Sequence, residues 1–354
     1  MFLLGVVLFA CTAPPSTPTP LATSIPLAPP ATTLAPTVSG PTATPTLAPN
    51  QFVNPVLNVD FPDPDVLQVG DTYYAYATNA GPTNIQLARS KDLVHWESLS
   101  GALPALPFWS KPQAGLTWAP DVTTSADSKT FIMYYTTRDA ASDKQCIGVA
   151  TGSNPEGPFR STGRANDEPL VCNPKEGGDI DPASFQDEDG TRYLLWKNDG
   201  NCCALDTWIY IQKLADDGLS LVGEPTRLIK NDQAWEGQLI EGPTLWKHDG
   251  KYFLFYSAND YRGERYAIGY AVAEHILGPY QKALRPLLTT DLKTAVPFGP
   301  GGQDVVVDKD GETWMVYHSW EPTLSARWMM IDPLVWENGV PVVKAAHQMP
   351  QPKP

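Results

Sequence analysis

Carboxylate side chains recur along this sequence beside proline or glycine. They lie in Phe61-Pro-Asp-Pro-Asp65, Trp118-Ala-Pro-Asp121, Ile180-Asp-Pro182 and Ile240-Glu-Gly-Pro243. A single Asp-Pro usually only starts a turn, but several carboxylates in one pocket would repel one another and push one pKa upward. A scaffold does not need that cost, whereas acid–base chemistry does. Glycosidic bond cleavage needs two such groups, one protonated to assist the leaving oxygen and one ionised to activate water.

The elements that position these acids follow a repeat of about sixty residues. A turn is followed by an aromatic residue, and three positions later by a second aromatic residue. The second aromatics are Tyr76, Tyr134, Trp196, Tyr256 and Tyr317, so the steps are 58, 62, 60 and 61 residues. Five strand-like copies at one period indicate a radial repeat with one four-stranded blade per copy. We therefore expect an all-β fold, a five-bladed β-propeller, over residues 51–354; the alternative is a β-sandwich with coincidental spacing.

The acidic motifs fall just before the first strand of each copy. The expected first strands begin near Asp65, Asp121, Ser184, Thr244 and Asp304. In a propeller, first strands line the central axis, so residues at their starts should converge on one funnel.

The motifs of this sequence resemble those of a known family. The four motifs above, together with Ser90-Lys-Asp-Leu-Val-His-Trp96 and the segment Arg327–Trp336, are similar to those of glycoside hydrolase family 43. The resemblance covers residues 51–345 and keeps the order of the motifs. It implies a five-bladed propeller and inverting hydrolysis of glycans that contain arabinose or xylose.

The resemblance also implies roles for three acids. Asp63 corresponds to the general base, Asp181 to the residue that orients the acid and tunes its pKa, and Glu241 to the general acid. Inversion requires room for a water between base and acid, so their carboxyl groups should lie ~6.5–9.5 Å apart.

Three further residues are candidates for substrate binding. Trp118 offers an apolar wall for a sugar ring, or else packs in the core. Asp121 faces the funnel, or else accepts hydrogen bonds from backbone amides. Arg327 contacts substrate hydroxyls, or else forms a structural ion pair. His318 is interpreted as a core or rim residue, and Glu236 as a solvated loop residue.

No cofactor is expected. Several relatives, especially those that cleave arabinan, carry a His after Gly-Pro-Gly that serves a central cation, but Gly302 and Gln303 stand here. We therefore expect no metal site built on that ligand, although the acidic loops leave a structural Ca²⁺ open.

The first fifty residues contain no Asp, Glu, Lys or Arg. Residues 1–11 are typical of a signal peptide, and Leu8-Phe-Ala-Cys11 resembles a bacterial lipobox that would make Cys11 the lipidated residue; an ordinary signal peptide is the alternative. Residues 12–50, rich in Pro and Thr, are expected to form a disordered linker. The protein is thus expected to be exported, and to touch the membrane only through an N-terminal lipid anchor.

Net charge limits the classes of binding partner, and the cysteines limit the possible disulfides. The net charge of −14 argues against nucleic acid as a partner. The resemblance to the family implies a plant cell-wall polysaccharide or oligosaccharide as the partner. Cys146, Cys172, Cys202 and Cys203 allow three disulfide pairings. A bridge between the adjacent Cys202 and Cys203 would be strained, which favours a pair that draws on Cys146 and Cys172.

Three functions remain in view. The leading one is an inverting α-L-arabinofuranosidase or β-xylosidase, with an endo-arabinanase as a variant of it. The second is a propeller that binds carbohydrate without cleaving it, in which the acids only hydrogen-bond sugar hydroxyls. The third is a protein-interaction scaffold, which predicts a closed or neutral funnel and a large apolar patch on one rim.

Overall fold

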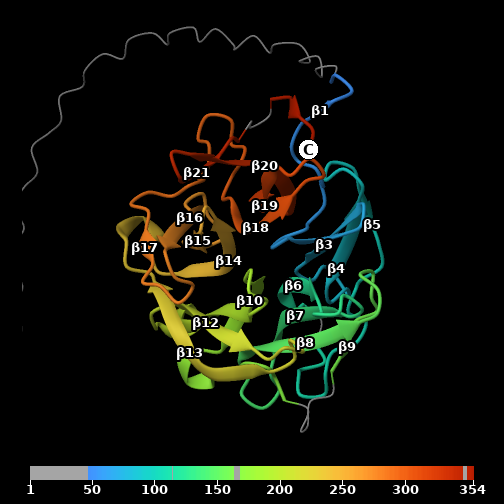
Figure 1. The fold of residues 1–354 in the computed structure, drawn as a ribbon, viewed down its shortest axis with the longest axis vertical. Helices are drawn as coiled ribbons and strands as arrows, with labels where there is room; N and C mark the ends of the chain where they lie inside the picture. Colours follow the sequence, from blue (N-terminus) through green and yellow to red (C-terminus); the bar gives the residue numbers. More distant parts are fainter. Residues whose placement is uncertain (1–46, 114, 163–167, 346–348) are drawn as a thin grey trace, which may run out of the picture. The chain divides into compact units, whose positions relative to one another are not determined.

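Five antiparallel sheets of four strands each follow one another along the chain and surround a common centre (Figure 1). The structure is a computed structural model that describes residues 47–113, 115–162, 168–345 and 349–354. The predicted five-bladed, all-β propeller is confirmed. The predicted signal segment 1–11 with Cys11, and residues 12–46 of the predicted linker, lie outside the described residues. Within the described ranges, no helix is long and apolar enough to cross a membrane.

Each blade is built from consecutive strands. Blade one comprises β2 (Asp65–Val69), β3 (Thr72–Ala77), β4 (Gln86–Ser90) and β5 (Trp96–Ser98). Blade two comprises β6 (Trp118–Thr124), β7 (Phe131–Arg138), β8 (Gln145–Gly152) and β9 (Arg160–Ser161). Blade three comprises β10 (Asp179–Gln186), β11 (Arg192–Asn198), β12 (Trp208–Leu214) and β13 (Leu221–Lys230). Blade four comprises β14 (Ile240–His248), β15 (Lys251–Ala258), β16 (Ala267–Ala273) and β17 (Gln281–Lys282). Blade five comprises β18 (Gly301–Val307), β19 (Thr313–Trp320), β20 (Arg327–Glu337) and β21 (Val340–Val343).

The repeated aromatic residues belong to the second strand of each blade. Tyr76, Tyr134, Trp196, Tyr256 and Tyr317 are all buried there. Alternate residues of these strands face the two neighbouring blades, because side chains of a strand point to opposite faces of its sheet. Short 3-10 helices η1 (Pro174–Glu176), η2 (Gly200–Cys203) and η3 (Ala234–Glu236) lie in the connections.

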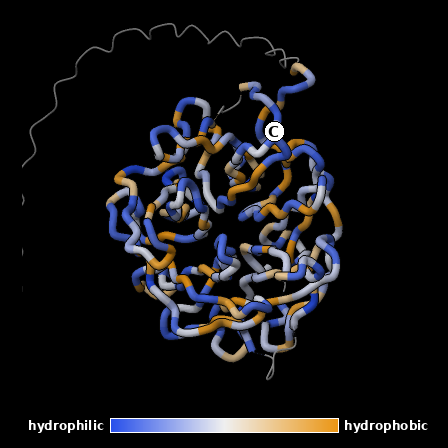
Figure 2. The backbone as a smooth tube through the Cα atoms, in the orientation of Figure 1, coloured by the Kyte–Doolittle hydropathy of each residue, from blue (hydrophilic) through white to orange (hydrophobic). Residues whose placement is uncertain are grey.

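The core is divided among the junctions between blades. The buried apolar residues form five clusters, and each cluster draws on two neighbouring blades. Accordingly, hydrophobic segments are spread around the whole ring in Figure 2 instead of gathering at one centre. Burial of apolar surface between sheets thus holds each blade to the next.

Aspartates also join blades near the axis. Asp304 accepts a hydrogen bond from the Val66 amide (2.9 Å). Asp65 accepts one from the Val122 amide (2.9 Å), and Asp121 accepts one from the Ser184 amide (2.8 Å). Three inner strands are therefore each tied to the next by a buried carboxyl group.

The segment that precedes blade one closes the ring onto blade five. β1 (Gln51–Phe52) pairs with β22 (Gln351–Pro352). The buried Asn54 side chain donates to the Ile331 carbonyl (2.8 Å) and accepts from the Ile331 amide (3.0 Å). Residues from both ends of the propeller thus hold β20.

The structure contains two disulfides. Cys146 is joined to Cys172, one of the bridges that the sequence left open. Cys202 is joined to its neighbour Cys203, contrary to the expectation that strain would prevent this bridge. A tight turn, η2, places these two side chains next to each other.

Candidate active site

A cavity of about 880 Å³ opens at the centre of the ring, lined by the starts of the inner strands. All six residues that the sequence singled out for catalysis or substrate binding line it: Asp63, Trp118, Asp121, Asp181, Glu241 and Arg327. The expectation that residues of separate blades would converge on one funnel is therefore met.

One backbone feature recurs where each inner strand begins. An equivalent residue of every blade has a positive φ: Asp63 (55°), Ala119 (39°), Asp181 (54°), Gly242 (56°) and Gly302 (55°). Glycine adopts this conformation without steric cost, and Asp tolerates it better than most residues. Asp63 and Asp181 occupy equivalent positions. In blade four the equivalent residue is Gly242, and Glu241 precedes it. The Glu241 side chain therefore reaches the cavity from a different backbone position.

Asp63 is surrounded by groups that keep it ionised. Thr78 donates to its Oδ2 (2.6 Å), the Arg327 guanidinium lies 3.7 Å from Oδ1, and His318 Nδ1 lies 3.3 Å from Oδ1. Burial alone would raise the pKa of Asp63, but Arg327, His318 and Thr78 together hold it well below its usual range. Asp63 is therefore a carboxylate at neutral pH, as a general base must be.

The pKa of Asp181 is shifted in the opposite direction. The Thr136 hydroxyl accepts a hydrogen bond from its backbone amide (3.1 Å), and its Oδ2 accepts one from the Gly242 amide (3.0 Å). Burial and the nearby Glu241 carboxyl raise the pKa of Asp181 to about 8. The Asp181–Glu241 pair therefore retains a proton at neutral pH, because two like charges at this range cannot both be ionised cheaply.

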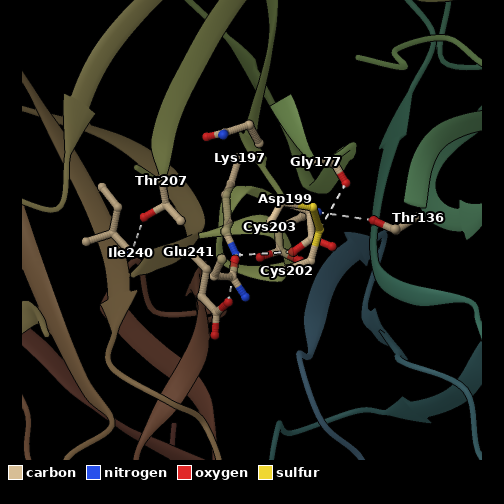
Figure 3. Close-up of polar contacts among 12 residues, drawn as sticks. Thr136, Gly177, Lys197, Asp199, Cys202, Cys203, Thr207, Ile240 and Glu241 are labelled. Atoms are coloured by element: carbon tan, nitrogen blue, oxygen red, sulfur yellow. Dashed lines mark hydrogen bonds and ion pairs between the residues drawn. A yellow bond between two sulfur atoms is a disulfide. The ribbon is translucent and has the colours of Figure 1, made fainter. Parts of the chain in front are cut away.

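Glu241 is held by two hydrogen bonds. Lys197 Nζ donates to Oε2 (3.1 Å), and the Tyr266 hydroxyl donates to Oε1 (2.8 Å). The preceding residue is fixed as well, because the Ile240 amide donates to the Thr207 hydroxyl (2.8 Å) (Figure 3). The carboxyl group is thus oriented within the cavity.

Sequence reasoning missed three polar neighbours of the acids. Lys197, Tyr266 and His318 are buried and contact Glu241 or Asp63. His318 is fully buried, as the core interpretation expected, and its Nδ1 also lies 3.1 Å from the Asp63 amide nitrogen. Each is a single residue without a repeated partner, so only its position at the end of a second or third strand could have indicated it.

The candidate binding residues differ in role. Trp118 is half-buried and lines the cavity. Arg327 lies beside Asp63 and over the rings of Tyr261 (4.9 Å) and Trp320 (5.7 Å), so it combines the predicted ion pair with a place at the cavity wall. Asp121 bonds the Ser184 amide, which matches the structural alternative that the sequence left open.

Both polar groups of the Gln303 side chain bond protein groups. Its amide nitrogen donates to the Gly242 carbonyl (2.6 Å), and its Oε1 accepts from Ser257 (2.8 Å). Gln303 thus has no free polar group to offer a cation. Gly302, which stands where several relatives have the cation-binding His, has no side chain. The chain's own residues do not fit a cation held in that way.

The prediction that Glu236 is a solvated loop residue is wrong. It is fully buried rather than solvated, and it accepts hydrogen bonds from Lys282 (2.8 Å) and Tyr256 (2.7 Å). This network joins η3, which lies between blades three and four, to β15 and β17 of blade four, and its residues do not line the cavity. Its role is structural.

Comparison with known proteins decides the family. The family model for "Glycosyl hydrolases family 43" matches residues 52–341. This chain belongs to glycoside hydrolase family 43. A solved structure described as a thermostable family-43 glycoside hydrolase superposes with a TM-score of 0.77 at 34% identity, over 86% of this chain and 99% of that one.

Other family-43 relatives carry more specific names. An endo-1,4-beta-xylanase structure from Bacteroides thetaiotaomicron has a TM-score of 0.70 at 29% identity, over 85% of this chain and 99% of that one. Xylosidase/arabinosidase 43B of Humicola insolens is 28% identical over 78% of this chain and 51% of its own length. An extracellular endo-arabinanase of Thermotoga petrophila is 29% identical over 62% of this chain and 50% of its own length. The chain spans about half the length of these curated relatives.

Proposed function

We propose that this family-43 protein is an inverting glycoside hydrolase that acts on arabinose- or xylose-containing plant polysaccharides or oligosaccharides. The observation that carries the proposal is the convergence of Asp63, Asp181 and Glu241 on one cavity, where Arg327 and Thr78 lie beside the Asp63 carboxyl group. Asp63 is ionised, and the Asp181–Glu241 pair retains a proton. The names of the relatives support the choice of sugars.

The reaction assigns one step to each acid. Asp63 removes a proton from a water molecule, whose oxygen attacks the anomeric carbon from the face opposite the leaving group. The bond from that carbon to the glycosidic oxygen breaks, and Glu241 protonates the departing oxygen. The attacking water then becomes the anomeric hydroxyl of inverted configuration, and both carboxyl groups exchange protons with solvent before the next turnover.

The neighbouring residues set up this division of labour. Arg327 and Thr78 stabilise the charge on Asp63, while Asp181 shares the proton needed by Glu241. Lys197 and Tyr266 orient the Glu241 carboxyl. A carbohydrate-binding propeller without activity would gain nothing from keeping Asp63 ionised while the Asp181–Glu241 pair in the same cavity retains a proton.

The decisive experiment follows the anomer released by NMR on aryl β-xylosides, aryl α-arabinofuranosides and the matching oligosaccharides. We expect a first product of inverted configuration. Glu241→Gln should lower kcat by about 10²- to 10⁴-fold on substrates with poor leaving groups, the range that a general acid contributes. Wild-type rates in this variant, or retained configuration in the product, would overturn the proposal.

We also propose that the protein is exported and anchored through a lipid on Cys11. The support is the apolar segment before Cys11 and the uncharged, Pro- and Thr-rich stretch that follows it. Labelling with a palmitate analogue in a bacterial host should mark the wild type and not Cys11→Ser. Equal labelling of both would contradict the anchor and leave export by an ordinary signal peptide.

A further inference from the structure

The turn η2 forms part of the cavity wall beside the proposed general acid. Asp199, Asn201 and Cys202 all line the cavity. Figure 3 shows Lys197, Glu241 and this turn within one group of polar contacts. The turn follows directly on β11, whose penultimate residue is Lys197.

Lys197 links the turn to the acid. Its side chain has no exposed surface, so its ammonium group must find all its partners within the protein. Nζ donates to Asn201 Oδ1 (2.7 Å) and to Glu241 Oε2 (3.1 Å), and it lies 3.9 Å from Asp199 Oδ1. A lysine ammonium rotates freely on a flexible stem, so the bond to Asn201 helps decide whether another N–H points at Glu241.

Asn201 itself stands in an exposed turn that needs its own restraint. The Cys202 amide donates to the Asp199 carbonyl (3.2 Å), and the Leu205 amide donates to the Gly200 carbonyl (2.9 Å). The Cys202–Cys203 bridge closes a small ring around the peptide bond between the two residues. Such a ring removes backbone rotations that an open turn would retain.

The sulfurs also fix the turn against its surroundings. Lys144 Nζ lies 3.0 Å from Cys203 Sγ and 3.6 Å from Cys202 Sγ, and the Gly177 carbonyl oxygen lies 3.6 Å from Cys202 Sγ. The bridge therefore faces blade two's β7–β8 connection on one side and η1 on the other. Asn201, the residue before it, is held between this contact and Lys197.

We propose that the Cys202–Cys203 disulfide is a positioning element for catalysis: it locks η2 so that Asn201 directs Lys197 onto the Glu241 carboxyl. This inference rests on the proposed function, because it assigns the disulfide an effect on proton donation by Glu241. Neither cysteine touches the reacting atoms. The effect reaches the acid through Asn201 and Lys197.

The test compares leaving groups. A glycoside with a poor leaving group needs the general acid to protonate the departing oxygen. A dinitrophenyl glycoside does not, because dinitrophenolate leaves without protonation. In the double variant Cys202→Ser/Cys203→Ser we expect kcat on the poor leaving group to fall roughly tenfold, a loss smaller than removal of the acid and typical of a displaced group. The dinitrophenyl glycoside should change less than about twofold. Asn201→Ala should show the same selective loss.

A matched control removes the other bridge. Cys146→Ser/Cys172→Ser breaks a disulfide whose cysteines have no contact with Lys197 or Glu241 among those described. It should lower the melting temperature without changing the ratio of the two rates. An unchanged ratio in the Cys202–Cys203 variant, or an equal change in the control, overturns the positioning role.

Reversible reduction of the wild type gives a second readout. Cys202 and Cys203 are exposed and Cys146 is fully buried, so mild dithiothreitol should reduce the exposed bridge first. Each bridge takes up two electrons and two protons to give two thiols, while dithiothreitol becomes a cyclic disulfide. Thiols counted by mass should appear together with the loss on the poor leaving group, and re-oxidation should restore the rate. Two free thiols with an unaltered rate would refute the inference, whereas an inactive wild type would refute the proposed function instead.

Discussion

At the scale of single residues, the site is organised by what surrounds each carboxyl group. Asp63 lies among Arg327, His318 and Thr78, whereas Asp181 lies against a second acid. The same residue type at equivalent blade positions thus has a lowered pKa in one case and a raised pKa in the other. The difference comes from the neighbours contributed by other blades.

This difference predicts the pH dependence of activity. The Asp181–Glu241 pair must hold a proton for catalysis, and the pKa of Asp181 is raised to about 8. Activity should therefore fall as pH rises through about 8, while the lowered pKa of Asp63 keeps the acidic limb below the ordinary range of aspartate. The measurement is kcat/KM between pH 4 and 10 on a substrate with a poor leaving group. If Asp181→Asn leaves the alkaline limb at the same pH, the assignment is wrong.

Gly302 predicts a second effect at this scale. A Cβ on Gly302 would lie 2.6 Å from Asp63 Oδ1 and 2.7 Å from His318 Nδ1, and the residue has a φ of +55°. Gly302→Ala should displace the base and lower kcat by at least roughly tenfold. Gly311→Ala is the matched control, because Gly311 also has a positive φ (+86°) but no atom within 4 Å of its added Cβ. Equal losses of kcat in the two variants would show that backbone strain alone is responsible.

The three acids could be predicted from the sequence, but their partners could not. Asp63, Asp181 and Glu241 stand in short motifs that recur at the blade period. Lys197, Tyr266 and His318 reach the site because strands from different blades end at the same place. Their types alone are as compatible with surface or core positions, so nothing local in the sequence marks them.

At the scale of secondary-structure elements, the inner strands are shaped by irregular starts. Register shifts interrupt the pairing between Trp118 and Asp121, Ile180 and Ala183, Glu241 and Thr244, and Gly301 and Asp304. Such bulges turn a side chain away from the regular alternation. The repeat predicted where these strands would lie, whereas the bulges depend on pairing with the second strand and were not foreseen.

The aspartates that join inner strands predict a pH-dependent stability. Burial raises the pKa of Asp121 to about 6 and that of Asp304 to about 7. The folded protein therefore binds these protons more tightly than the unfolded chain, whose aspartates titrate near 3.8. Their contribution to the free energy of unfolding is complete below about pH 4 and is lost as pH rises through 6 to 7.

Thermal unfolding at several pH values measures this contribution. We expect the melting temperature of the wild type to drop by roughly 5 °C between pH 5 and 8. Asp121→Asn keeps an oxygen acceptor for the Ser184 amide and should reduce the drop, whereas the exposed Asp310→Asn should not. A drop of the same size in both variants would remove Asp121 from the explanation.

At the scale of the whole molecule, the ring is held shut by a short segment from outside the repeat. Asn54 bonds both backbone groups of Ile331, so Asn54→Ala would leave the buried Ile331 N–H without its partner, while the Ile331 C=O would keep only the longer bond from Gln351 Nε2 (3.3 Å). An unsatisfied buried group costs about 1–3 kcal/mol. We expect a clear loss in the urea midpoint at unchanged m-value, with activity at 25 °C retained. The exposed Gln68→Ala serves as control, and an equal midpoint in both variants would contradict the role of Asn54 in closure.

Five-fold repetition has a further consequence at this scale. The apolar clusters lie between blades, so no blade can bury its faces alone. The number of blades was readable from the aromatic period because every junction needs the same packing. The pairing of β1 with β22 could not be predicted from the sequence, because two-residue strands leave no periodic pattern.

Because β1 and β22 lie side by side, residues 51 and 352 come to the same place on the propeller (Figure 1). A short peptide could splice them, and new termini could then be opened in an exposed turn such as that after Gly250. Such a circular permutant would keep every blade junction and every cavity-lining side chain. The order of the blades along the chain could therefore change without altering the chemistry of the cavity at which the blades meet.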